Sequence, residues 1–329
     1  MIKEIVAPYI DTTADSDPFQ DQYIDSVDRA TGEQMRSLLH HPGFQSLEAN
    51  WRSLQWLLSN LETGEALKLY LLDITKAELL QDIKNTGGQL ESSNLYRQLV
   101  MAGPQTLGGE NWDLLVGAYD FGPGTDDLYL LAALGTIGSQ CGGPFIAAAS
   151  PEMLGCSSLH SEPDPWKWEG HDTKVSENWM ALRRSLAAPW IGLVIPRILL
   201  RLPYGRNTDE LEQFTFEEIS AEPRHEEFLW GNPAFACALL IAQAFQDKGW
   251  EMEPGDMLEI EDLPSYSYES GGETSMLPCA ELFLTERAGS AIMEHGIMPI
   301  ASYQNRNSVR VIRFQSIAEP LRNLVGSWD

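Results

Sequence analysis

The chain has 329 residues with 48 acidic and 22 basic side chains, so its formal net charge is −26, and 43% of its residues are hydrophobic. This composition indicates a folded globular protein with a sizeable core. It disfavours nucleic acid and anionic membranes as partners, because each phosphate contact needs a Lys or Arg side chain. The four cysteines form no Cys-x-x-Cys pair, and neither a signal peptide nor a membrane-length apolar run is visible. We therefore expect a reduced, cytoplasmic protein without membrane insertion.

The residue pattern of the N-terminal part of the chain predicts an arm followed by a long amphipathic helix. Residues 1–30 are polar and acidic and are predicted to form an N-terminal arm. After the break at Pro42-Gly43, apolar residues recur at steps of three and four and fall on one helical stripe: Phe44, Leu47, Trp51, Leu54 and Leu58. We interpret this stripe as the core-facing side of the helix. On that interpretation, Trp51→Ala lowers the free energy of unfolding by about 3–5 kcal/mol.

The middle of the chain alternates strand and helix patterns. Strands are predicted at 66–74, 114–119, 145–149 and 191–195. Thr75 and Glu78 form a capping-box pattern at the start of one helix, a second helix is predicted at 125–140, and Ser150-Pro151 indicates a third helix start. Three successive strand–helix units favour an α/β fold with a mixed, largely parallel sheet flanked by helices.

The second half adds an acidic insertion and a buried helix. Residues 207–227 are predicted to be a solvated surface loop, because eight of them are acidic: Asp209, Glu210, Glu212, Glu217, Glu218, Glu222, Glu226 and Glu227. A helix through residues 233–245 is apolar almost all round and is predicted to be buried. Strands are predicted at 281–284, 297–300 and 309–314, and a helix at 285–295. The expected division is an arm to residue 30, a body domain over 31–305, and a C-terminal strand with a short tail over 306–329.

The residue patterns of common catalytic sites are missing. The sequence has no phosphate-binding loop, no Gly-x-Ser-x-Gly elbow and no His-Glu-x-x-His motif. Residues 122–124 (Gly-Pro-Gly) lie between a predicted strand and helix, as in dinucleotide-binding folds, but Asp126 and Asp127 follow where a pyrophosphate would dock. Trp166 and Trp168 suit sugar stacking, although packing is the commoner role of such a pair. We therefore predict no catalytic residue, no cofactor-binding residue, no metal ligand and no cofactor.

Several stretches, matching in the same order along the chain, resemble one protein family. The stretch at 41–54 is similar to the signature helix of the large subunit of the type VI secretion contractile sheath (the TssC, VipB or EvpB type). Five further stretches match the same family: 117–122 (Gly-Ala-Tyr-Asp-Phe-Gly), 144–151 (Pro-Phe-Ile-Ala-Ala-Ala-Ser-Pro), 202–205 (Leu-Pro-Tyr-Gly), 228–234 (Phe-Leu-Trp-Gly-Asn-Pro-Ala) and 286–300. The resemblance extends in register over about residues 34–320.

The resemblance implies a structural protein and not an enzyme. Such subunits pair with a small sheath subunit and stack into a helical tube around an inner tube, and contraction drives an effector-loaded spike outward. Family members continue beyond the position of Pro320 into an interlocking C-terminal domain, so we expect this chain to hold the body domain without it. The strand at 309–314 is then expected to have an open edge. Two alternatives remain: an accessory sheath-like regulator or cap that lacks the polymerising domain, and a soluble α/β ligand-binding protein or enzyme.

Overall fold

The computed structural model describes residues 19–103, 109–212, 214–220, 223–270 and 273–328. The chain divides into two compact units. The first contains residues 1–45 and 203–227, and the second contains residues 46–202 and 228–329. The predicted boundaries at residues 30 and 305 stay predictions. Residues 1–18 of the predicted arm lie outside the described residues, and the helix α2 (Gln20–Leu39) already begins within its last part.

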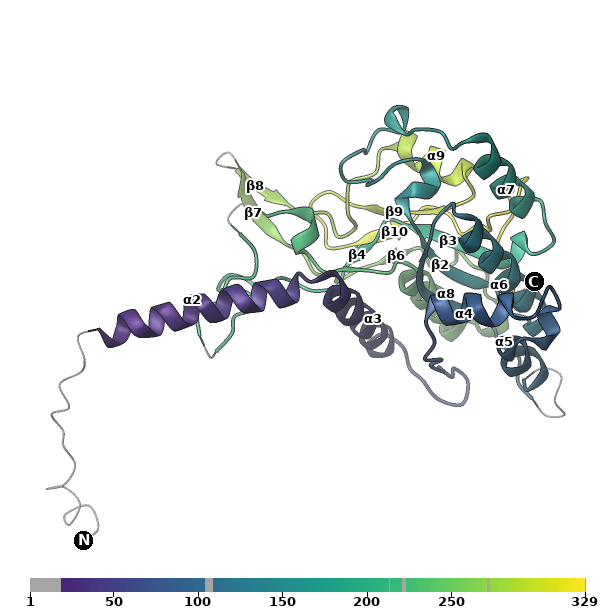
Figure 1. The fold of residues 1–329 in the computed structure, drawn as a ribbon, viewed down its shortest axis with the longest axis horizontal. Helices are drawn as coiled ribbons and strands as arrows, with labels where there is room; N and C mark the ends of the chain where they lie inside the picture. The colour runs from purple at the N-terminus through teal and green to yellow at the C-terminus, as the bar shows by residue number, and fades with distance from the viewer. Residues whose placement is uncertain (1–18, 104–108, 213, 221–222, 271–272, 329) are drawn as a thin grey trace, which may run out of the picture. The chain divides into compact units, whose positions relative to one another are not determined.

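The first unit consists of α2 and the acidic insertion at 203–227 (Figure 1). The insertion has the short 3-10 helix η7 (His225–Glu227) and is not simply solvated, because Phe216 and Glu218 are buried. The Glu218 carboxylate accepts a hydrogen bond from the Tyr204 backbone N–H at 2.8 Å, and the Glu218 N–H donates to the Tyr204 carbonyl at 2.8 Å. The prediction of a fully solvated loop is therefore wrong, since this acid is hydrogen-bonded within its own unit.

A six-stranded sheet forms the centre of the second unit, in the order β1-β2-β3-β9-β10-β6. The strands β1 to β3 and β9 are parallel neighbours, whereas β10 is antiparallel to β9 and to β6. Their bounds are β1 (Leu115–Phe121), β2 (Phe145–Ala149), β3 (Ile191–Ile195), β6 (Glu259–Ile260), β9 (Met298–Ser302) and β10 (Val309–Val311). The predicted α/β class with a mixed, largely parallel sheet is confirmed.

Two further antiparallel pairs lie outside this sheet. They are β4 (Ile198–Leu199) with β5 (Trp230–Gly231), and β7 (Ser267–Ser270) with β8 (Glu273–Met276). The α-helices are α3 (Pro42–Ser59), α4 (Lys76–Lys84), α5 (Asn94–Tyr96), α6 (Thr125–Cys141), α7 (Thr173–Arg183), α8 (Ala234–Lys248) and α9 (Glu286–Glu294). Short 3-10 helices occur at η2 (Leu90–Ser92), η4 (Pro151–Leu154), η5 (Pro165–Lys167), η6 (Ala188–Trp190) and η8 (Gly249–Glu251), and a π-helix at η3 (Arg97–Met101).

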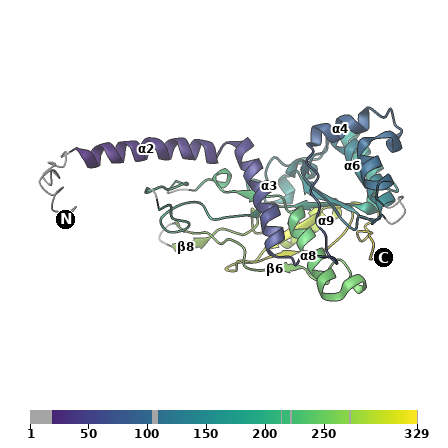
Figure 2. The ribbon, with the colours of Figure 1, turned by 90° about the horizontal axis from the view of Figure 1, so that it is seen from below.

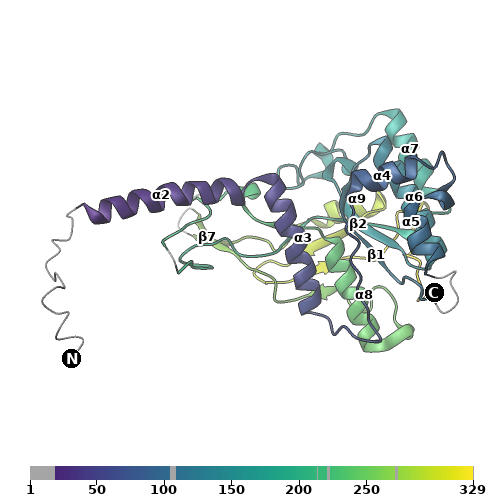
Figure 3. The ribbon, with the colours of Figure 1, turned by 60° about the horizontal axis from the view of Figure 1, so that its bottom comes forward.

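Helices cover both faces of the central sheet (Figures 2 and 3). Side chains from α4, α6, α7 and α9 form one apolar cluster, which includes Phe145 and Ala147 of β2. Side chains of α8, together with Leu57 of α3, form a second cluster with Ile146 of the same strand. Successive β2 residues therefore enter opposite layers, as the period of two in a strand requires. The helix α8 is buried nearly all round, as predicted.

Local signals place most elements correctly, but three strand predictions fail. The capping box of Thr75 and Glu78 is confirmed at the start of α4. Residues 66–74 belong to no strand, and neither do residues 281–284. The predicted open edge of the 309–314 strand is also wrong, because β10 lies between β9 and β6 and pairs with both. Each error concerns which backbone segments form hydrogen bonds to another strand. This pairing depends on segments that are far apart in the sequence.

The helix α3 turns a different face to the core from the one predicted. Its buried residues are Ala49, Ser53 and Leu57, which follow one another at intervals of four. Trp51 is 60% exposed and Leu47 is 56% exposed. The prediction of a buried Trp51 is therefore wrong, and Trp51→Ala is no longer expected to cost 3–5 kcal/mol. The small Ala49 and Ser53 side chains let the helix approach the core closely, with Leu57 inserted into it.

A mostly buried ion pair fixes the orientation of α3. The Glu48 carboxylate accepts a hydrogen bond from Nε of Arg201 at 2.8 Å and another from Nε of Arg52 at 2.7 Å. Burial alone raises the pKa of Glu48, but the hydrogen bonds and charges of Arg201 and Arg52 outweigh it and hold the pKa below its ordinary value of 4.5. Glu48 is therefore charged at neutral pH.

This pKa shift predicts a pH dependence of stability. The contribution of Glu48 is fully present above pH 4.5, its unfolded value, and is lost as the pH falls through its lower folded pKa. In urea titrations between pH 7 and pH 3, Glu48→Gln should lose part of the acid-side slope, by up to about 1.4 kcal/mol per pH unit. Identical slopes in the wild type and the variant would contradict the assignment.

Candidate functional site

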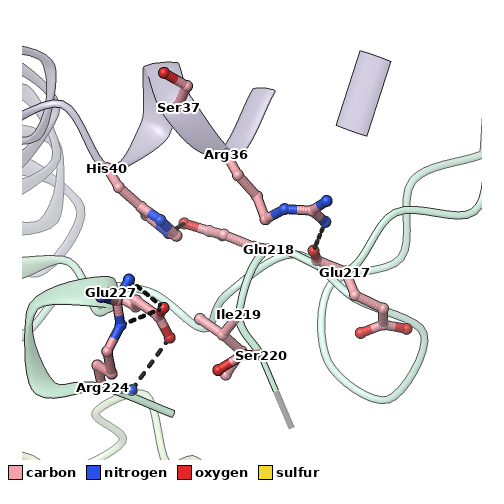
Figure 4. A pocket seen from close by; sticks show the side chains of 9 residues that line it. All are labelled: Arg36, Ser37, His40, Glu217, Glu218, Ile219, Ser220, Arg224 and Glu227. Carbon is pink, nitrogen blue, oxygen red and sulfur yellow. Dashed lines mark hydrogen bonds and ion pairs between the residues drawn. The ribbon is translucent and has the colours of Figure 1, made fainter. Parts of the chain in front are cut away.

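The first candidate site is a polar recess of about 440 Å³ within the first unit (Figure 4). Side chains of the last part of α2 and of the acidic insertion line it: Arg36, Ser37, His40, Glu217, Glu218, Ile219, Ser220, Arg224 and Glu227. Figure 4 shows the His40 ring pointing toward the Glu218 carboxylate, and the Nε2–Oε1 distance is 3.8 Å. The recess thus joins two segments about 180 residues apart in the sequence.

Opposite charges in this recess face one another. The Arg224 guanidinium contacts the Glu227 carboxylate at 2.9 Å, and the Arg224 N–H donates to the same carboxylate at 3.1 Å. Burial raises the pKa of Glu227, but these hydrogen bonds and the charge of Arg224 outweigh it and lower the pKa overall. The Arg36 guanidinium donates to the Glu217 carbonyl at 2.9 Å. The Arg36 hydrogen bond holds the insertion against α2, whereas the Arg224–Glu227 pair lies within the insertion itself. Together these contacts explain the recess as a structural link.

The turn at residues 122–124 is also occupied by structural contacts. The Asp127 carboxylate accepts a hydrogen bond from the Gly122 N–H at 2.7 Å and pairs with Lys76 at 2.7 Å. Asp126 pairs with Lys84 at 2.7 Å. Both carboxylates therefore connect the start of α6 to lysines of α4 at the place where a dinucleotide phosphate would dock. The geometry favours the structural interpretation of this turn.

The Trp166 and Trp168 candidates do not act together, because each contacts a different partner. The Trp168 indole N–H donates to the Glu162 carbonyl at 2.8 Å, whereas Trp166 is exposed, with the Arg287 guanidinium 5.7 Å from its ring centroid. The His41 ring accepts a hydrogen bond from the Gly43 N–H at 3.2 Å. In the described part of the chain, no group of three or more His, Cys, Asp or Glu side chains has a metal-binding arrangement. The described helices also include none with the length and apolar character needed to cross a bilayer.

The second candidate site is the exposed apolar seam of α3, which consists of Phe44, Leu47, Trp51, Leu54 and Leu58. Leu47, Trp51 and Leu58 are exposed, and Phe44 and Leu54 are half-buried. The spacing alternates three and four residues, which is the a/d pattern that packs helix against helix. An exposed apolar seam with this spacing has the form of a helix-packing surface.

Sequence reasoning found the residues of this seam but gave them the wrong direction. The row of Ala49, Ser53 and Leu57 was the signal that could have identified the true core face, because small residues at intervals of four permit close helix packing. The sequence search also missed the recess of Figure 4, since its two halves lie far apart in the chain.

Comparison with known proteins identifies the family. Residues 21–318 match the VipB family, described as EvpB/VC_A0108, tail sheath N-terminal domain. The chain is 33% identical over 306 residues to the type VI secretion system sheath protein TssC1 of Pseudomonas aeruginosa. The aligned part covers 90% of this chain and 61% of that relative, so the chain spans less than two thirds of the relative's length. The chain therefore belongs to the VipB family of tail sheath N-terminal domains, as its sequence motifs predict.

Proposed function

We propose that this chain forms the body of a large sheath subunit in a type VI secretion contractile sheath. In this role it is a cytoplasmic structural protein without catalytic activity, and it assembles with a small sheath subunit around an inner tube. Family membership over residues 21–318 and the similarity to TssC1 support the proposal. The paired charges in the recess of Figure 4 and at residues 122–124 are consistent with a structural role.

The observation that carries the partner assignment is the outward seam of α3. A helix with an a/d seam on one side and a separate core-facing row on the other can bind two neighbours at once. Apolar side chains at a and d spacing pack one helix against another, and Trp is enriched among the residues that dominate interface energy. We therefore assign the seam to a helix of the small sheath subunit.

Co-purification with the small sheath subunit of the same organism tests this assignment. The wild-type chain should form a stable complex, as measured by size-exclusion chromatography with light scattering. Leu47→Asp should weaken the complex at least about 30-fold, because it places a charge within an apolar interface. The matched control is Leu186→Asp, since Leu186 is 95% exposed and lies outside the seam.

The stability of the two variants separates binding from folding. Both substitutions change exposed side chains, so the free energy of unfolding should stay within about 0.5 kcal/mol of the wild type. Equal affinity of Leu47→Asp and Leu186→Asp would remove the seam from the interface. A wild-type chain that forms no complex with the small subunit would contradict the proposed sheath role itself.

A further inference from the structure

One ring nitrogen of His40, in the recess of Figure 4, is buried and has no hydrogen-bond partner in the described part of the chain. This nitrogen is Nε2, and the His40 side chain as a whole is only 20% exposed. Removing a polar atom from water without giving it a hydrogen bond costs free energy, so folded proteins rarely leave such an atom unpaired. His40 is therefore a position where a change of protonation alters the contacts of the recess.

The Glu218 carboxylate lies opposite this nitrogen and belongs to the acidic insertion. The distance from His40 Nε2 to Glu218 Oε1 is 3.8 Å, which is longer than a hydrogen bond of about 2.7–3.2 Å. The Glu218 side chain is only 1% exposed, and its Oε2 atom accepts the hydrogen bond from the Tyr204 N–H. A shift of about 1 Å in the His40 side chain would complete a hydrogen bond to Oε1.

The charged groups that face His40 within the first unit belong to α2 and to the acidic insertion. They are Arg36 on α2, and Glu217, Glu218, Arg224 and Glu227 on the insertion; His41 and His225 are the other imidazoles of this unit. Both cations contact other groups, because Arg36 donates to the Glu217 carbonyl at 2.9 Å and Arg224 contacts the Glu227 carboxylate at 2.9 Å. His40 is thus a further basic side chain that faces these carboxylates.

The surrounding carboxylates favour the protonated form of the His40 ring. Burial raises the pKa of Glu227, but the hydrogen bonds and charge of Arg224, together with a positive charge on His40, lower this pKa overall. Such coupling is reciprocal, so the negative charge of Glu227 favours a proton on His40, and the nearby Glu218 carboxylate acts in the same direction. A protonated imidazole also has a donor on each nitrogen, which gives Nε2 a hydrogen to donate.

We propose that His40 is a pH-sensitive latch between α2 and the acidic insertion. The protonated ring donates from Nε2 to the Glu218 carboxylate and fastens the two segments, and loss of the proton removes this charge-assisted contact. The hydrogen bond from Arg36 to the insertion persists in both states, because a guanidinium keeps its charge over this range of pH. The link therefore loosens at higher pH but does not separate.

The sign of the pH dependence follows from where the proton is bound. The imidazolium gains its carboxylate partners only when α2 and the insertion lie together, so the closed recess binds more protons than the open one. Closure is consequently stronger as the pH falls through the range in which imidazole titrates, and weaker as the pH rises through it. The latch is internal to the first unit, so its test does not depend on the proposed sheath role.

Amide hydrogen exchange of the full chain at about pH 5.5 and about pH 8, corrected for the intrinsic pH dependence of exchange, tests the latch. The Glu218 amide is a suitable reporter, because its N–H donates to the Tyr204 carbonyl at 2.8 Å within the insertion. Its opening equilibrium constant should be at least about 5-fold smaller at the lower pH in the wild-type chain. Equal opening constants at the two pH values overturn the proposal.

Substitutions assign the pH dependence to one side chain. His40→Gln should abolish it, because the Gln side chain is polar but does not titrate. Glu218→Gln should abolish it as well, since it keeps an acceptor for the Tyr204 N–H and removes the charge. The matched control is His41→Gln, which replaces the adjacent, exposed imidazole and should keep the 5-fold difference of the wild type.

The variants also define the result that contradicts the latch. A pH dependence that survives in His40→Gln belongs to another group, such as His225 or the overall negative charge of the chain, and overturns the proposal. If His40→Gln fails to fold, Glu218→Gln decides in the same way, because an unchanged pH dependence without the Glu218 charge is incompatible with the latch.

Discussion

Replacing Gly155 with alanine should lower the free energy of unfolding by about 4 kcal/mol, because the backbone at this position has no room for a side chain. A Cβ atom at Gly155 would lie 1.6 Å from the Glu169 carbonyl oxygen. The residue also has a φ of +79°, which L-residues adopt only with strain. The Glu169 N–H donates to the Gly155 carbonyl at 2.8 Å, so the clash would break the closure of this loop.

Gly170→Ala is the matched control for this prediction. A Cβ at Gly170 would meet no atom within 4 Å, although this residue directly follows Glu169. Its unfolding free energy should therefore stay within about 0.5 kcal/mol of the wild type in urea titrations. If both glycine variants had the same denaturation midpoint, the close approach of Glu169 to Gly155 would not affect the free energy of unfolding, and the prediction would be wrong.

Arg201→Met should destabilise the second unit by about 3 kcal/mol, because it removes one partner of a mostly buried ion pair. Arg201 has a side chain only 8% exposed and donates to the Glu48 carboxylate at 2.8 Å. Without the Arg201 guanidinium, the Glu48 carboxylate would lose its most buried counter-charge, although its side chain is only 12% exposed. The pair joins α3 to the segment that follows β4. The lost stability should therefore appear as a lower urea concentration at the unfolding midpoint.

The second arginine on the same carboxylate provides the comparison. Arg52 donates to Glu48 at 2.7 Å, but its side chain is 35% exposed and the pair lies along one helix. Arg52→Met should cost at most about 0.5 kcal/mol, since water screens an exposed ion pair. Equal losses for the two arginine variants would contradict the idea that burial determines the strength of these contacts.

The strands and helices that were predicted correctly are those whose sequence patterns lie within a few neighbouring residues. The apolar run of β2, the nearly all-apolar pattern of α8 and the Thr75–Glu78 capping box each act over a few residues, so the sequence displays them directly. The ordered motifs also predicted the family, which the match over residues 21–318 confirms. The absence of catalytic and metal-binding residues remains a prediction.

The errors at residues 66–74 and 309–314 have a common physical reason. A strand exists only if another backbone lies at hydrogen-bonding distance, and the position of that backbone is set by remote parts of the chain. Residues 66–74 have the composition of a strand without a paired neighbour in the described chain. The strand β10, in contrast, gains a second neighbour from β6, whose two residues give almost no sequence signal.

The α/β class, most element positions, the family and the five residues of the α3 seam follow from patterns in the sequence. The outward direction of this seam, the pairing of Glu48 with Arg201 and the recess between the acidic insertion and α2 become visible only in the folded chain. Periodicity records that a helix has an apolar stripe, but the same stripe fits a core or a partner equally well. Which face is buried depends on the surfaces that distant segments bring to the helix.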